Sequence, residues 1–86
     1  MPTIAYFLGI YVRMYFNDHE PPHFHVWYQG FRARVLFATG EVVDGRLPVT
    51  VARVVKDWAV LRHNALVKNW IAARSDGQVE RIAGPE

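Results

Sequence analysis

The segment DHEPPHFHVW, residues 18–27, contains three of the four histidines in the chain together with one aspartate. Residues i and i+2 of an extended strand project to the same side, so His23 and His25 are expected to share a face. Neighbouring imidazoles can transfer protons near neutral pH, hydrogen-bond an anion or hold a metal ion. Asp18 and His19 are close enough in sequence to take part. The segment is therefore the candidate functional site.

A rigid turn is the competing interpretation of the same segment. Two consecutive prolines fix the backbone, and the polar residues before them commonly hydrogen-bond to nearby backbone groups in turns. Such a turn would explain Asp18 and His19 without any function. It does not explain the alternation of His23 and His25, which is a property of a strand.

The elements around this segment are strands in the first half of the chain. Glycines follow β-rich runs, and no segment before Pro48 has helical periodicity. We predict an antiparallel meander of four or five strands, drawn from residues 3–8, 10–16, 23–28, 31–37 and 41–46. Tight turns are expected at Leu8-Gly9, Gln29-Gly30 and Thr39-Gly40.

The second half of the chain is predicted to be helical. Apolar residues recur at helical spacing after Pro48, namely Val51, Val54, Val55, Trp58, Leu61 and Ala65. The later apolar residues lie on a rotated face, so we expect a break near His63-Asn64, with Asn64 as a possible N-cap. Residues 48–74 would pack on one face of the sheet, and the tail, 75–86, could include a short edge strand at 79–82. The expected fold is one α+β domain spanning residues 1–86.

The predicted hairpin at Gln29-Gly30 sorts the residues of its two strands into faces. With a two-residue turn, residues whose numbers sum to 59 lie opposite one another and point to the same side. The face expected to be buried under the helices carries Phe24, Val26, Tyr28, Phe31, Ala33 and Val35. The outer face is expected to carry His23, His25, Trp27, Arg32, Arg34 and Leu36, with His25 opposite Arg34.

The outer face combines cations with aromatic rings. The preceding strand can add Tyr11, Arg13 and Tyr15 to Trp27, Arg32 and Arg34, with Asp18 and His19 beside them. Arginine suits planar recognition of phosphate, histidine supplies hydrogen bonds, and aromatic rings stack on bases. A single-stranded RNA or a protein partner is therefore the expected ligand of this face.

Two other functions remain open for the same residues. In a metal-independent ribonuclease, His23 and His25 would act as base and acid while Arg34 holds the phosphate. In a metal-binding regulator, His19, His23 and His25 would be the ligands, with Asp18 as the alternative to His19 for the third position. We expect no metal and no cofactor, because the fixed charge of Arg34 beside His25 disfavours a cation. Whether the protein is an enzyme stays undecided.

Composition excludes several classes of protein. The chain has 86 residues, a net charge of +2 and no cysteine, so a disulfide framework and thiolate zinc sites are excluded. A hydrophobic share of 51% is too high for a disordered chain. No apolar run is long enough to span a bilayer and no export signal is present, so we expect a cytoplasmic protein without a membrane association.

The sequence resembles the small bacterial family called domain of unknown function (DUF) 4160. The resemblance rests on PTI, F-L-G-I, R-M-Y-F-N-D-H-E-P-P-H-F-H, G-R-L-P and N-W, with His-Pro-Pro-His-Phe-His as its most specific part. It implies a compact α+β domain that is often encoded beside another small protein, of the DUF 2442 type, in a toxin-antitoxin-like pair. The expected partners are therefore that neighbouring protein, single-stranded RNA or a second copy of the chain.

Overall fold

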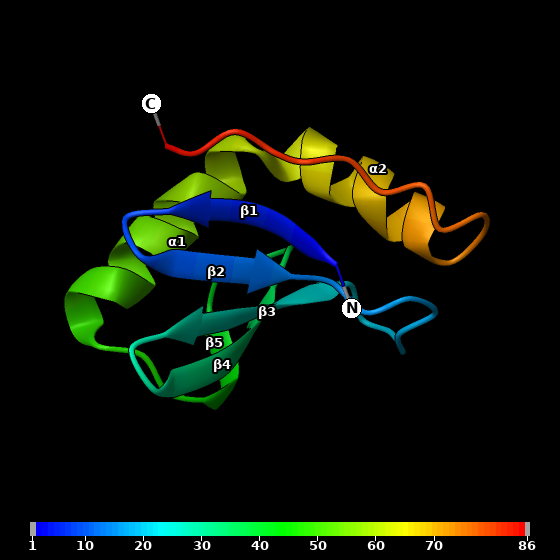
Figure 1. The fold of residues 1–86 in the computed structure, drawn as a ribbon. Helices are drawn as coiled ribbons and strands as arrows, with labels where there is room; N and C mark the ends of the chain where they lie inside the picture. The colour runs from blue at the N-terminus through cyan, green and yellow to red at the C-terminus, as the bar shows by residue number, and fades with distance from the viewer. Residues whose placement is uncertain (1, 86) are drawn as a thin grey trace.

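The computed structural model describes residues 2–85, which form five strands followed by two helices. The strands are β1 (Thr3–Phe7), β2 (Ile10–Arg13), β3 (His23–Tyr28), β4 (Phe31–Leu36) and β5 (Val42–Gly45), and the helices are α1 (Val49–Leu61) and α2 (His63–Ala73). All four pairings are antiparallel and join strands in chain order (Figure 1). The α+β class and the five-stranded meander predicted from the sequence are confirmed.

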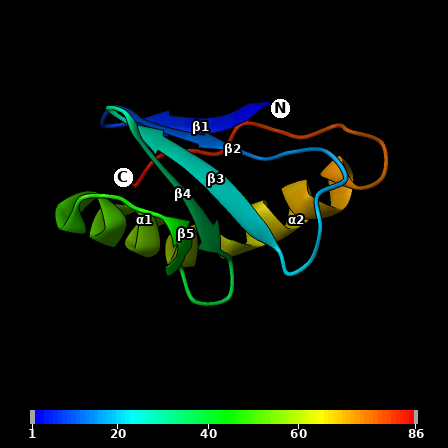
Figure 2. The same ribbon diagram turned by 90° about the horizontal axis from the view of Figure 1, so that it is seen from below.

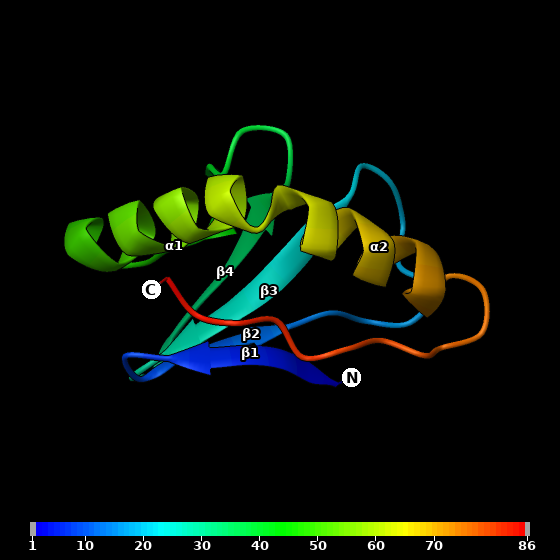
Figure 3. The same ribbon diagram turned by 90° about the horizontal axis from the view of Figure 1, so that it is seen from above.

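The molecule has two layers, a sheet and a helical layer. Both helices lie on the same side of the sheet and follow one another along it (Figures 2 and 3). None of the described helices covers the opposite face. A meander with one covered face needs apolar residues at alternate positions only, and this accounts for the alternation in β3 and β4.

Two tight turns fix the register of the sheet. Both residues of Gln29-Gly30 have positive φ, at 45° and 85°, and Leu8-Gly9 is similar, at 53° and 77°. Such turns match the right-handed twist of the strands they join. The register that follows from Gln29-Gly30 pairs His25 with Arg34, so the predicted pairing is confirmed.

One predicted strand end and one predicted tight turn are wrong. The second strand, expected to reach Phe16, ends at Arg13. The next amide, of Met14, still donates to the Pro2 carbonyl, and the chain then turns at Asn17, which has a positive φ of 57°. The expected tight turn at Thr39-Gly40 is a longer loop, residues 37–41. The Gly40 amide donates to the Leu36 carbonyl across this loop.

The helical region breaks close to the predicted point, but no side chain caps the second helix. A single residue, Arg62, separates α1 from α2. Its carbonyl still accepts a hydrogen bond from the Leu66 amide, so the backbone ladder continues almost without interruption. The expected N-cap role of Asn64 is therefore wrong, because Asn64 lies inside the helix.

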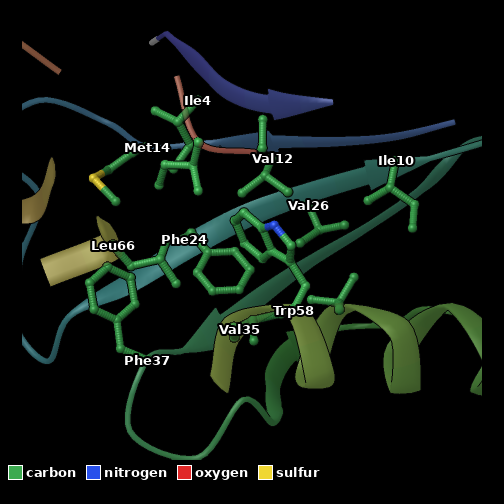
Figure 4. Close-up of a cluster of buried hydrophobic side chains, with 14 of the residues drawn as sticks. Ile4, Ile10, Val12, Met14, Phe24, Val26, Val35, Phe37, Trp58 and Leu66 are labelled. Carbon is green, nitrogen blue, oxygen red and sulfur yellow. The ribbon is translucent and has the colours of Figure 1, made fainter. Parts of the chain in front are cut away.

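The core lies between the sheet and the helices. Trp58 of α1 is fully buried among the core side chains, close to Phe24 (Figure 4). Its indole packs against the rings of Phe7 and Phe24 at centroid distances of 5.2 and 5.6 Å. Val26 and Val35 are fully buried on the same face of the sheet. The inner face predicted from the alternation is thus confirmed.

The C-terminal tail is extended and runs between β1 and the helices (Figures 1 and 3). The Ile82 amide donates to the Ile4 carbonyl, but residues 79–82 form no strand, so the edge strand considered from the sequence is absent. The Asn69 amide group bonds to both backbone groups of Glu80, and the Trp58 indole donates to the Ala83 carbonyl. These contacts fix the tail against the core.

Candidate functional site

The loop between β2 and β3 positions the candidate site at one end of the sheet. It lies beside the last turn of α2, where the Asn17 amide donates to the Ala73 carbonyl (Figure 1). Glu20 in the loop also forms an ion pair with Arg74. The Glu20–Pro21 peptide bond is cis. The loop is therefore held to the helical layer at two points, and it brings Asp18 back over the start of β3.

Asp18 lies at the centre of the histidines. Its Oδ2 is 2.9 Å from His23 Nε2 and 3.1 Å from His25 Nε2, while its Oδ1 is 2.9 Å from His19 Nδ1. One potential ligand atom from each of Asp18, His23 and His25 lies within 4.8 Å of the others. We call these three residues the histidine cluster. His19 lies beside them, but 67% of its side chain is exposed.

The alternation of β3 predicts that His23 lies on an exposed surface, but the structure buries it. Only 2% of its side chain is exposed, and its ring lies 5.5 Å from the ring of Trp70. The strand does turn His23 to the same side as His25, but the loop and the end of α2 close over this end of the sheet. The expected exposure of His23 is therefore wrong, because a cover from distant residues decides it.

The cluster holds its carboxylate ionised and His25 neutral at neutral pH. Burial alone would raise the pKa of Asp18, but hydrogen bonds from His25 and from the His19 backbone, with the charge of His23, bring that pKa below its ordinary value. Burial lowers the pKa of His25, and its hydrogen bond to Asp18 offsets this only in part. Both protonation states favour the binding of a cation.

The middle of the sheet carries a second group of side chains on the face without helices. Tyr11 pairs with Trp27, and Arg13 pairs with His25, across β2 and β3. The Arg13 guanidinium lies 4.7 Å from the centre of the Trp27 ring and 5.3 Å from that of Tyr11. Its Nε donates to Thr3 Oγ1. Arg13 is thus held against two aromatic rings in the middle of the open face.

Beside this stack is a shallow depression of about 340 Å³. Its lining includes Tyr15, His25, Trp27, Arg32, Arg34 and Asp44. The Tyr15 ring meets the His25 ring edge-on at 4.4 Å, although Tyr15 lies past the end of β2. From here on, the outer face means the cationic and aromatic side chains on the side of the sheet without helices, namely Tyr11, Arg13, Tyr15, Trp27, Arg32 and Arg34.

Two residues of this surface were missed from the sequence. Asp44 pairs with Arg34 across β4 and β5, and their side chains approach to 3.7 Å. The ring of Tyr6 lies 4.6 Å from that of Tyr11. Strand pairing could have indicated both. The irregular register between Arg34 and Val35 hid the first, and the outer face predicted from the sequence did not extend to β1.

The predicted site residues therefore form two adjacent groups. Asp18, His19 and His23 gather at the loop, whereas the arginines and aromatic residues lie on the open sheet. His25 belongs to both groups, since its Nε2 faces Asp18 and its ring contacts Tyr15. Among residues 2–85, no helix is long and apolar enough to cross a bilayer.

These observations define a small α+β protein with a histidine-containing loop over an open antiparallel sheet. A family model for the domain of unknown function DUF4160 matches residues 9–71, which include both groups of side chains. The chain belongs to this family, as the resemblance in its sequence implied. No curated protein and no solved structure matches the chain.

Proposed function

We propose that this protein binds single-stranded RNA through the outer face. The observation that carries the proposal is the ordered stack of Arg13 on Trp27 and Tyr11 in the middle of an uncovered sheet. Proteins that bind single strands combine cationic groups for the backbone with flat groups on which bases stack. Arginine planes and aromatic rings both serve as such stacking groups.

The charge of the outer face supports an anionic ligand. It contributes three arginines, of which Arg32 is exposed, and Asp44 is the one carboxylate among the residues that line the depression. The chain as a whole carries only +2, so the local arrangement rather than net charge would attract a phosphodiester. Because the arginines come from β2 and β4, on either side of β3, they would contact different phosphates of a strand that crosses the sheet.

A ribonuclease is a weaker account of the same residues. General acid-base catalysis needs a side chain within hydrogen-bonding reach of the substrate. His23 is buried, and its Nδ1 lies 2.8 Å from the Pro21 carbonyl, so this ring is occupied by the protein itself. Of the three residues considered for catalysis, His25 and Arg34 alone border the depression.

Fluorescence anisotropy with a short labelled single-stranded RNA tests the proposal. Trp27→Ala should weaken binding by about 1–3 kcal/mol, the usual contribution of one stacked base. Three phosphate contacts predict that the logarithm of affinity falls against the logarithm of salt with a slope of about −2, and Arg34→Ala should reduce that slope by about 0.7. Arg53→Ala is the matched control, because it removes one exposed arginine from α1.

A protein from a neighbouring gene is the competing occupant of this face. Aromatic and arginine side chains also dominate contacts between proteins, but such binding would change little with salt. Titrating the chain with that protein at low and physiological salt gives the comparison. Two results together would overturn the proposal in favour of the protein partner. The chain would bind that protein independently of salt and lose this binding in Trp27→Ala, and it would not bind RNA at low salt.

A further inference from the structure

The histidine cluster contains a contact that the protein alone does not satisfy. His23 Nδ1 lies 2.8 Å from the Pro21 carbonyl, and a carbonyl only accepts hydrogen bonds, so Nδ1 carries the hydrogen. The other ring nitrogen, Nε2, is thereby turned toward the cluster. This atom lies 2.9 Å from Asp18 Oδ2 and has no solvent exposure. Because water does not reach Nε2, this nitrogen has no hydrogen-bond partner, and a cation beside it would contact both the ring and the carboxylate.

The direction of the contact favours a metal ion over a proton. Despite the short distance, His23 Nε2 has no hydrogen-bond partner, because Asp18 lies off the axis along which a ring N–H would point. Ligands around a metal have this arrangement, since each lone pair points at the ion rather than at the other ligand. The buried and unpartnered Nε2 therefore suits an ion that the imidazole ring shares with the carboxylate.

The donors and spacing of the cluster fit a divalent transition metal. Two imidazole nitrogens with one carboxylate oxygen, and positions left open for water, are a common set for zinc and for ferrous iron. Ligand atoms around a tetrahedral zinc are roughly 3.3 Å apart. Oδ2 of Asp18 is 2.9 Å from His23 Nε2 and 3.1 Å from His25 Nε2, and both distances are within a few tenths of an ångström of that spacing. The three ligand atoms all lie within 4.8 Å of one another.

The surroundings also support a metal. The hydrogen bond from His23 Nδ1 to a backbone carbonyl is the usual way in which proteins orient a metal-binding imidazole. The His19 amide donates to Asp18 Oδ1, so this bond fixes the carboxylate and leaves Oδ2 for an ion. Arg34, expected from the sequence to repel a cation, directs its guanidinium toward Asp44 at 3.7 Å, whereas His25 Nε2 faces Asp18.

We propose that Asp18 Oδ2, His23 Nε2 and His25 Nε2 bind one divalent transition-metal ion, with the remaining coordination positions taken by water. Of the two residues that the sequence offers as a third ligand, this site uses Asp18 and leaves out the exposed His19. It does not rest on RNA binding, since His25 alone is shared with the depression of the outer face. An ion here would also link the loop between β2 and β3, through Asp18, to His23 and His25 of β3.

Calorimetric titration of the untagged, chelator-treated chain with zinc chloride tests this site. We expect one zinc per chain. Asp18→Asn and His25→Ala should each weaken binding by more than about 100-fold, because losing a residue that merely orients a ligand already costs roughly 10–100-fold. Neither variant removes a buried core residue, and thermal unfolding of the metal-free variants checks that they fold.

Two matched histidine variants complete the experiment. His63→Ala removes the exposed histidine of α2, outside the cluster, and His19→Ala removes the exposed histidine beside it. Both should bind zinc within about 3-fold of the wild type, a difference of roughly 0.65 kcal/mol. Absence of one-to-one binding, or equal binding by folded Asp18→Asn, would overturn the proposal. Loss of zinc binding in His19→Ala would also overturn it, because it would return His19 to the ligand set.

Discussion

The two faces of the sheet use alternate residues of the same strands for different purposes. Phe24 and Val26 of β3 are fully buried on the side of α1, where they pack with the core around Trp58. Their neighbours His25 and Trp27 lie on the other side and contact Tyr15 and Arg13. One covered face can therefore stabilise the fold while the other remains available to a ligand.

His23 shows where this division ends. It has the alternation of an outer residue, yet the loop and Trp70 bury it almost completely. The start of β3 is thus enclosed on both sides, while its middle is open on one. A metal site needs such an enclosed and oriented arrangement, whereas a stacking surface needs exposure, and the two proposals fall on the corresponding regions.

The largest expected effect is a difference in the free energy of unfolding between variants of two tryptophans, Trp58 in the core and Trp27 on the outer face. Trp58→Ala should lower the free energy of unfolding by about 3–5 kcal/mol, because it leaves a large cavity in the core. Trp27→Ala should lower it by less than about 1 kcal/mol, since the ring is only partly buried on the open side. Urea unfolding of both variants measures the difference. Equal losses would mean that the outer face is part of the stabilising core.

A smaller effect is expected where the tail joins the helical layer. Asn69→Ala should cost about 2–3 kcal/mol, because the buried Asn69 side chain makes two hydrogen bonds to the backbone of Glu80 and both are lost. Asn64→Ala, an exposed position of the same helix, should cost less than about 0.5 kcal/mol. Hydrogen exchange of the Ile82 amide should accelerate in the first variant only. Unchanged protection there would refute the role of Asn69 as an anchor.

The smallest effect on stability is expected for two glycines of the sheet, Gly45 in β5 and Gly30 in the turn between β3 and β4. A Cβ at Gly45 would lie 2.2 Å from the Arg32 carbonyl oxygen and the residue has a φ of 76°, so Gly45→Ala should cost about 2 kcal/mol and distort the depression. Gly30 has a similar φ but open space around it, so Gly30→Ala should cost only about 1 kcal/mol. Thermal unfolding gives the order. A smaller loss at Gly45 than at Gly30 would contradict the close packing of β4 and β5.

Local rules predicted the sheet well but not the enclosure of its end. A two-residue turn at Gln29-Gly30 fixes which side every residue of β3 and β4 takes, so the pairing of His25 with Arg34 could be derived from the sequence. The cover over His23 comes from Trp70, 47 positions later, which no local pattern indicates. Likewise, the contact of Arg34 with Asp44 depends on the loop of residues 37–41, for which the sequence predicted a two-residue turn at Thr39-Gly40.

The proposed use of the outer face is tested most directly by the indole NMR signals of the three tryptophans. Trp27 lies on the outer face, Trp58 is buried against the tail, and Trp70 is buried beside His23. Titration of the ¹⁵N-labelled chain with single-stranded RNA should shift the Trp27 signal progressively and leave that of Trp58 in place. Binding of RNA with no change at Trp27, or with an equal change at Trp58, would contradict the assignment of RNA binding to the open face of the sheet.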